Sequence, residues 1–210
     1  MSDDDRELAE RMTRGQRQNP EWSRVRAGRL TASRFGEVIR ACKRSSHPPS
    51  LVKSLLGEYN LDGVKAVQWG FKHEQQAVDD YVANFSKTVT EVGLLLHESG
   101  VLAASPDRLE EPDSLLEVKC PFSFRNSSIP DALSDPKFCI AIDDNGQFSL
   151  KTNHVYYDQC QGQLHISGRS RLSFFVWLPQ GSLRVDVMRD EGWGAKNLPL
   201  LIDFYYRVVF

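Results

Sequence analysis

The sequence lacks any apolar run long enough to cross a membrane and any recognisable export signal. A transmembrane helix needs roughly 20 consecutive apolar residues, and no stretch of the 210-residue chain approaches that length. The acidic opening, MSDDDRELAE, does not have the basic and then apolar layout of a signal peptide. We therefore expect a soluble intracellular protein with no membrane partner, and the sequence does not choose between cytoplasm and nucleus.

Cysteine is scarce, and a strong charge of one sign is missing. No two cysteines form a CxxC pair, so the sequence predicts reduced, mostly buried thiols rather than a zinc cluster or a disulfide framework. The formal net charge is −2 and the pI is near 6.2. This balance argues against a protein that coats nucleic acid non-specifically over its whole surface. The four cysteines are Cys42, Cys120, Cys139 and Cys160.

Positive charge is nevertheless concentrated near the start of the chain. Between Arg14 and Arg44 nine basic residues face only two acidic ones, Glu21 and Glu37. Such a run is either an ordinary solvated surface or a site that holds the nucleic-acid backbone. With 40% apolar residues, the chain is large enough for one globular domain with a sizeable core.

Helical and β-rich patterns alternate along the chain, which predicts an α/β fold with a central mixed β-sheet flanked by helices. The β-rich runs TVTEVGLLLHE, VLAAS and SLLEVKC are typical of a meander, and CIAIDDNGQFSL of a hairpin around Asn145 and Gly146. Two more strands, RLSFFVWLP and SLRVDVMRD, come late in the chain. The expected helices span about residues 3–18, 31–42, 51–56, 64–85, 153–168 and 194–208.

The longest helical pattern carries one carboxylate on its apolar stripe. Val67, Phe71, Val78 and Tyr81 recur at steps of three and four residues, so we expect them to face inward. Glu74 lies on the same stripe. An isolated buried charge costs several kcal/mol or more, so this carboxylate must be paired, protonated or bound to a cation.

The run SLLEVKC places an acid and a base side by side. Side chains alternate across a strand, so Glu117 and Lys119 share one face. Asp107, ten residues before Glu117, approaches it if the two flanking strands pair, and Glu74 could reach the same point. Three converging carboxylates favour a hard cation, Mg²⁺ or Mn²⁺. The plainer alternative is a surface ion pair between Glu117 and Lys119, which contributes at most about 1 kcal/mol.

Four spaced motifs resemble one nuclease family. SPD followed by EVKCPF resembles the PD-(D/E)xK nuclease superfamily, and LEVKCPFSFR is similar to the phage-type recombination exonucleases of the lambda exonuclease and YqaJ group. The stretches WSRVRAGRLTAS, WGFKHE and YYDQCQ resemble further motifs of that group in the same order. Together they span Trp22 to Gln163, most of the chain.

The resemblance implies a catalytic centre made from the central strands. Asp107 and Glu117 match the metal ligands of the family, with the backbone carbonyl of Val118 as a further ligand, and Lys119 matches its catalytic lysine. Glu74 matches the helical carboxylate that assists at the metal, directly or through water. The implied cofactor is Mg²⁺, for which Mn²⁺ substitutes.

The resemblance also implies two features around that centre. Gln159 matches a catalytic glutamine of the late motif; its alternative is a solvent-facing helix position. The basic and hydroxyl residues Arg26, Ser33, Ser105 and Arg125 resemble a pocket for the 5′-terminal phosphate of DNA, since guanidinium forks and hydroxyls donate to phosphate oxygens. Arg26 could instead be one surface charge among several.

The implied activity is a Mg²⁺-dependent 5′-to-3′ exonuclease that degrades one strand of double-stranded DNA from a 5′-phosphorylated end, as in recombination or end resection. Two alternatives stay open: a structure-selective endonuclease with the same metal site, and a non-catalytic module that binds DNA ends. The implied partners are double-stranded DNA ends and a single-strand annealing protein. Parts of the family form three-subunit rings, so a homotrimer is a further expectation.

The expected organisation is a single exonuclease domain over residues 1–210. A helical, basic, DNA-binding part covers about 1–62, and the catalytic core covers about 63–210. The stretch 126–153 is longer than the resemblance implies, which favours a lid or a flap that contacts DNA. Trp22 and Trp69 are expected to support the motifs rather than to stack on bases, and His73 to point away from Glu74.

Overall fold

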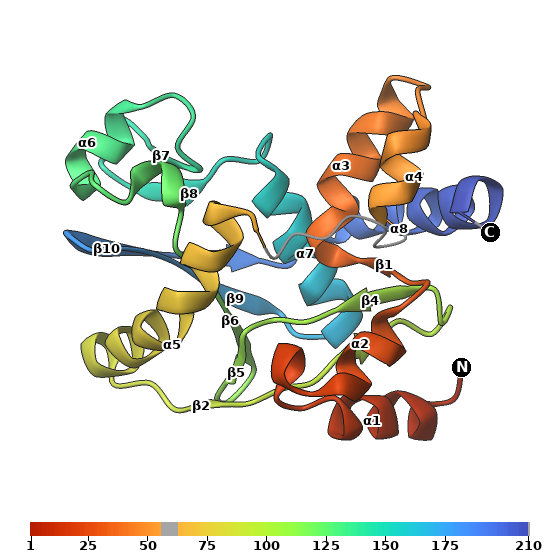
Figure 1. Cartoon of the computed structure of the whole chain (residues 1–210). Helices are drawn as coiled ribbons and strands as arrows, with labels where there is room; N and C mark the ends of the chain where they lie inside the picture. Colours follow the sequence, from red (N-terminus) through yellow and green to blue (C-terminus); the bar gives the residue numbers. More distant parts are fainter. Residues whose placement is uncertain (56–62, 210) are drawn as a thin grey trace.

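A mixed five-stranded sheet forms the centre of the protein (Figure 1). The computed structural model describes residues 1–55 and 63–209. The central strand β6 (Ser114–Lys119) pairs in parallel with β9 (Arg171–Leu178), whereas the remaining pairs are antiparallel. The predicted α/β fold with a mixed sheet between helices is therefore confirmed. In order, the sheet contains β10 (Gly181–Met188), β9, β6, β5 (Arg108–Glu110) and β2 (Val89–Thr90).

The predicted meander is wrong, because its strands divide between two sheets. The run TVTEVGLLLHE provides β2 to the central sheet and β3 (Leu95–Leu96) to a second sheet of order β1-β4-β3. The chain changes sheet at Gly93, whose Cβ, if present, would lie 2.0 Å from the Glu10 carbonyl oxygen. Only glycine allows this close approach of the first helix. The other two strands are β1 (Leu30–Thr31) and β4 (Leu102–Ala104).

The first predicted helix is shorter than expected. The pattern over 3–18 gives α1 (Asp3–Met12), and Gly15 (φ 83°) starts a separate 3-10 turn, η1 (Gln16–Gln18). Leu56 and the predicted boundary near residue 62 lie outside the described residues. The following helices are α2 (Pro20–Arg26), α3 (Ala32–Lys43), α4 (Pro49–Leu55) and α5 (Lys65–Phe85).

The second half of the chain follows the prediction more closely. The hairpin around Asn145 and Gly146 is confirmed as β7 (Ile140–Ile142) and β8 (Phe148–Leu150). The late helix is α7 (Val155–Ser167), which ends at Gly168 in the left-handed conformation. The C-terminal helix begins earlier than predicted. The remaining elements are η2 (Phe122–Phe124), α6 (Ile129–Ser134), α8 (Glu191–Phe204) and η3 (Tyr205–Val209).

Strand β6 is covered on both faces. Leu116 and Val118 pack with the second half of α5, including Tyr81, whereas Leu115 belongs to the larger core beneath α7. Residues 126–153 add buried side chains, among them Phe138, to this larger core. None of the described helices is long and apolar enough to span a membrane. Cys139 and Cys160 are buried, whereas Cys42 and Cys120 are half-buried, and all four are free thiols.

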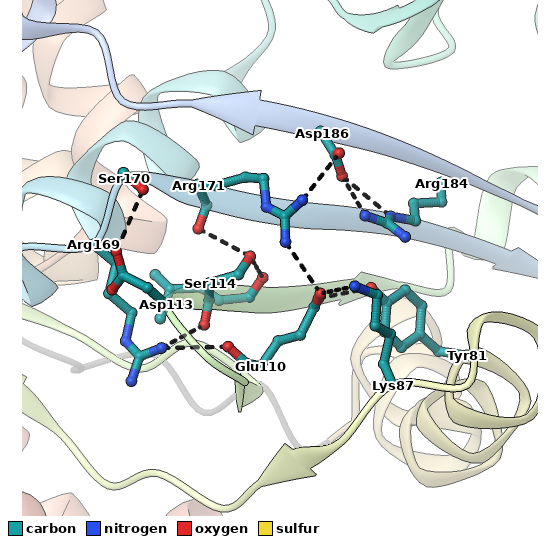
Figure 2. A network of polar contacts seen from close by, with 11 residues as sticks. Tyr81, Lys87, Glu110, Asp113, Ser114, Arg169, Ser170, Arg171, Arg184 and Asp186 are labelled. Atoms are coloured by element: carbon teal, nitrogen blue, oxygen red, sulfur yellow. Dashed lines mark hydrogen bonds and ion pairs between the residues drawn. The ribbon is translucent and has the colours of Figure 1, made fainter.

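A polar cluster joins residues of β5, β9, β10 and the end of α5 (Figure 2). Its centre is Glu110, which is fully buried. Oε2 of Glu110 accepts a hydrogen bond of 2.7 Å from the Tyr81 hydroxyl, and Oε1 lies 3.2 Å from Nζ of Lys87 and 3.6 Å from the Arg171 guanidinium. Arg171 and Arg184 both pair with Asp186 on β10. These contacts tie four elements of the fold together.

Candidate active site

The centre of the site is the carboxylate of Glu117, which is 2% exposed on β6. Its Oε1 accepts hydrogen bonds of 2.5 Å from Nζ of Lys119 and from Nε2 of Gln159. Its Oε2 accepts one of 2.7 Å from Nε2 of Gln163. Gln159 is itself buried, so its alternative assignment as a solvent-facing residue is wrong. Donors to a buried carboxylate offset the loss of hydration and fix its orientation.

Gln163 was not predicted as a site residue, although the sequence contains a signal for it. It lies four residues after Gln159 on α7, and residues four apart project from the same face of a helix. Both glutamines therefore face β6, one for each oxygen of Glu117. A helix that presents two buried amides toward a sheet indicates a buried acceptor there.

Asp107 is held beside Glu117 by the pairing of β5 with β6. Its backbone N–H donates to the carbonyl of Leu116 at 3.1 Å, and its Oδ2 accepts from the N–H of Val118 at 2.6 Å. Burial, followed by repulsion from Glu117 and Glu74, raises the pKa of Asp107 well above its ordinary value. The expected approach of Asp107 to Glu117 across the short connection is confirmed.

Glu74 comes from α5, one turn before the part of the helix that packs on the sheet. Burial and the Glu117 carboxylate raise the pKa of Glu74, while Arg108, Lys119 and Arg17 oppose the shift. Glu74, Asp107 and Glu117 therefore form one electrostatically coupled group. When all three are ionised, the carboxylates outnumber the Lys119 ammonium, and Arg108 and Arg17 supply the other opposing charges.

Lys119 points along the same face as Glu117, as the strand alternation predicts. Its Nζ also lies 4.9 Å from the centre of the Tyr156 ring. Burial would lower the pKa of Lys119, but the Glu117 carboxylate, with Tyr156 and Asp107, raises it above the ordinary value. A surface ion pair does not describe this contact, because both partners are largely shielded from solvent.

The carboxylates have the chemistry of a divalent-metal site but not a ready-made cage. In the part of the chain that the structure describes, no three His, Cys, Asp or Glu side chains are arranged to hold a metal ion. The donor set is oxygen-only, which suits Mg²⁺ or Mn²⁺. Such an ion fits if Asp107 and Glu117 each supply one oxygen and backbone carbonyl and water oxygens complete its coordination, as Mg²⁺ commonly requires.

The site opens into a cleft of about 490 Å³. Glu74, Asp107 and Lys119 lie on its wall, together with Trp22 and Tyr156. Cys120 also lines the cleft, where burial, Asp107 and Glu74 raise the pKa of its thiol to about 12. Cys120 is therefore a neutral thiol at physiological pH.

Comparison with known proteins assigns the chain to a family. Residues 21–170 match the model of the YqaJ-like viral recombinase domain. The chain belongs to this family. Its residues are 24% identical to the alkaline nuclease of Autographa californica nuclear polyhedrosis virus, over 90% of the chain but 48% of that protein. The chain thus spans about half the length of this curated relative.

Solved structures show the same fold. The alkaline exonuclease LHK-Exo of Laribacter hongkongensis is 25% identical and has a TM-score of 0.67, with 90% of this chain and 91% of that one covered. A SOX–DNA complex gives a TM-score of 0.64 at 14% identity, over 95% of this chain and 69% of that one, and supports the fold alone. The predicted membership of the YqaJ group is confirmed.

Three of the four residues predicted to hold a phosphate are linked in this YqaJ-like domain. The Arg26 guanidinium donates to the Thr31 hydroxyl at 3.3 Å, and this hydroxyl lies 3.2 Å from that of Ser33. Arg26 also lies 4.9 Å from the centre of the Trp22 ring, whose Nε1 donates to Ser105 at 3.0 Å. Trp22 therefore supports the motif, as expected.

The electrostatics around Arg26 favour an anion. Burial and the nearby Arg34 guanidinium lower the pKa of Arg26, although it remains a cation at neutral pH. Among the described residues, the contacts of the Arg26 guanidinium are a hydroxyl and an aromatic ring. Arg34 already pairs with Glu37 at 3.1 Å, so Arg26 is the guanidinium better placed for an added anion such as phosphate. Arg34 was not predicted as part of this group.

Arg125 lies outside this chain of contacts. Its guanidinium donates to the carbonyl of Phe122 at 2.8 Å and lies 4.0 Å from the centre of the Phe122 ring. The structure therefore links Arg26, Ser33 and Ser105 but places Arg125 on the segment after β6.

On α5, His73 packs against the rings of Trp69 and Trp177, as expected for a residue that points away from Glu74.

Proposed function

We propose that this chain is a divalent-metal-dependent nuclease that degrades one strand of duplex DNA from a 5′-phosphorylated end. The observation that carries the proposal is the group of three buried or half-buried carboxylates beside a single ammonium, in a cleft. Membership of the YqaJ family and the likeness to an alkaline nuclease and to an alkaline exonuclease support the same activity. A bound divalent ion would offset the mutual repulsion of these carboxylates.

Asp107 and Glu117 would hold the ion, with the Val118 carbonyl as a further ligand. When bound, a divalent ion polarises the phosphate and lowers the pKa of a water. Glu117 enters this role with its orientation already fixed by Gln159 and Gln163. The Lys119 ammonium supplies a positive charge where negative charge develops on the phosphate, and its remaining N–H groups orient the attacking water.

The proposed 5′-to-3′ direction of digestion rests on the residues around Arg26. Guanidinium and hydroxyl donors bind phosphate oxygens, so Arg26, Ser33 and Ser105 are suited to a terminal phosphate. A terminal phosphate bound there would set the distance from the strand end to the scissile bond. The basic residues of the first 44 positions would add a salt-sensitive hold on the DNA backbone.

The decisive experiment is a digest of linear duplex DNA with either 5′-phosphate or 5′-hydroxyl ends, with Mg²⁺ and with EDTA. We expect mononucleotides released from the 5′ end, faster from phosphorylated ends and not at all in EDTA. A covalently closed circle of the same sequence should stay intact. Cleavage of the circle would instead establish an endonuclease, and binding without cleavage in Mg²⁺ and Mn²⁺ a DNA-end-binding module.

A further inference from the structure

Helix α5 divides into a half that builds the core and a half that builds the cleft. All of its buried residues, Ala77, Val78 and Tyr81, come after Glu74. Before Glu74 the helix contacts the rings of Phe122 and Trp177 through Trp69 and His73, but it has no buried residue there. Phe71, which the apolar stripe predicts to face inward, is instead 52% exposed and lines the cleft. That prediction was wrong, because the helix continues past the edge of the core while its periodicity continues unchanged.

An arginine lies over this exposed ring. The Cζ atom of Arg17 is 5.2 Å from the centre of the Phe71 ring, within the range of a cation–π contact. Arg17 comes from η1, on a different wall of the same cleft. The neighbouring Gln16 fixes this turn, since its side-chain amide donates to the carbonyls of Val92 (3.0 Å) and Pro106 (2.7 Å). Pro106 directly precedes Asp107, so the turn is anchored to the catalytic strand region.

The pair therefore has three properties together. Phe71 lies one helical turn before Glu74, its ring is held beside a guanidinium plane, and about half of its surface is open. An isolated exposed apolar residue needs no explanation. A fixed pair of an aromatic ring and a guanidinium group that lines a cleft does indicate a binding role, because nucleobases of any sequence stack on both kinds of plane.

We propose that Phe71 and Arg17 form a stacking platform for a nucleobase of the DNA end that enters the cleft. The inference rests on the proposed nuclease function and adds a contact to the base, whereas the groups around Arg26 and Lys119 address phosphate. Phe71 is a substrate-binding residue in this scheme. The platform would hold the end of the strand in line with the carboxylates without reading its sequence.

The test uses the Lys119→Ala background, so that binding is measured without turnover. A duplex with 2-aminopurine at its 5′-terminal position reports stacking through its fluorescence. We expect the protein to change this fluorescence on binding, and Phe71→Ala to remove the change and weaken binding at least about fivefold. Phe71→Trp should preserve both, whereas Phe71→Leu should lose the fluorescence change because leucine is apolar but not planar.

Salt dependence separates stacking from phosphate contact. Phe71→Ala should weaken binding by the same factor at each salt concentration, because a phenyl ring displaces no counterions from the DNA. Tyr206→Ala is the matched control. Tyr206 is 55% exposed in η3, and Figure 1 shows the C-terminus on the side of the molecule away from α5, so its loss should change neither signal nor affinity.

The outcomes distinguish the two levels of the argument. If DNA binds but Phe71→Ala or Phe71→Leu gives the parental fluorescence change, the platform is refuted and the nuclease proposal stands. If no variant, including the parent, binds DNA ends, both proposals fail. Phe71 is exposed, so a folding defect is not expected, and unchanged circular dichroism of Phe71→Ala establishes that a loss of signal comes from the missing ring.

Discussion

Two glutamates on neighbouring strands are buried to almost the same degree, yet the charges around them differ. Glu110 on β5 is surrounded by Tyr81, Lys87 and Arg171 (Figure 2). Glu117 on β6 is surrounded by two neutral glutamine amides, one lysine and two further carboxylates. Burial alone would raise the pKa of Glu110, but the Tyr81 hydroxyl and the Lys87 ammonium lower it. In the other cluster, burial and mutual repulsion raise the pKa of Asp107 and of Glu74.

The difference teaches how to separate a structural charge from a functional one. Around Glu110 the protein supplies its own cations, so the cluster is complete and serves the fold. Around Glu117 it supplies fewer, which suits the cationic ligand that the proposed function requires. Burial by itself would have ranked the two glutamates as equal. The sign of the surrounding charge, not the depth, distinguishes the candidate active site.

The largest expected effect comes from removing the lysine of each cluster. Lys119→Ala should lower the rate of DNA hydrolysis at least about 100-fold, because a charge that stabilises the transition state is lost. DNA binding should remain measurable in a filter or anisotropy assay. Lys87→Ala is the matched control and should leave turnover per folded molecule unchanged while lowering stability. Full turnover by the Lys119→Ala variant would falsify the assigned role.

The second prediction concerns how much Glu110 stabilises the fold as the pH is lowered. Its folded pKa lies below the ordinary value of 4.5, so its stabilisation is fully present above that pH and is lost as the pH falls through the folded pKa. Glu110→Gln should therefore lower the free energy of unfolding by about 1–2 kcal/mol at pH 7, with a difference that shrinks in acid. Urea titrations of both proteins between pH 3 and 7 measure this difference in the free energy of unfolding. A constant difference over that range would contradict the ionic origin.

The third prediction compares two buried glutamines on one helix. Gln163 donates to Glu117, whereas Gln161 donates to the carbonyl of Met188 and accepts from the N–H of Asp190. Gln163→Ala should lower kcat about tenfold by releasing the carboxylate from its fixed orientation. Gln161→Ala should lower only the melting temperature. Equal losses of kcat in the two variants would show that kcat depends on the integrity of α7 and not on the hydrogen bond to Glu117.

The smallest expected effect concerns the residues proposed to bind phosphate. There the cluster has an excess of positive charge, the opposite of the cluster around Glu117. Arg26→Ala should reduce the preference for 5′-phosphorylated over 5′-hydroxyl ends by about fivefold to tenfold. Arg125→Ala is expected to act in the same direction but less, since its guanidinium lies apart from Thr31 and Ser33. Initial rates on both substrates decide the matter. An equal loss on both ends would indicate a general backbone contact instead.

Much of the site could be predicted because it depends on local rules. Strand alternation placed Glu117 beside Lys119, and the short connection between β5 and β6 brought Asp107 to them. Helical periodicity put Glu74 on the inner stripe. The four motifs predicted the family. These inferences needed only spacings of two, four and ten residues, which the chain geometry converts directly into proximity.

The remaining features depend on tertiary contacts that spacing does not encode. The meander failed because a single close approach at Gly93 sends the chain to another sheet. Phe71 was assigned to the core because periodicity gives the face of a helix but not where the core ends. The cation cluster around Glu110 joins residues from positions 81 to 186, and no local pattern connects them.

Strand β6 has a hydrogen-bonded neighbour on each side, β5 and β9, whereas the first half of α5 has no buried residue of its own. Amide hydrogens of β6 should consequently exchange only through opening of the whole sheet, and those around Phe71 through local fraying. Under the proposed function, substitutions in the first half of α5 would therefore change substrate binding without displacing Glu117 and Lys119 on β6.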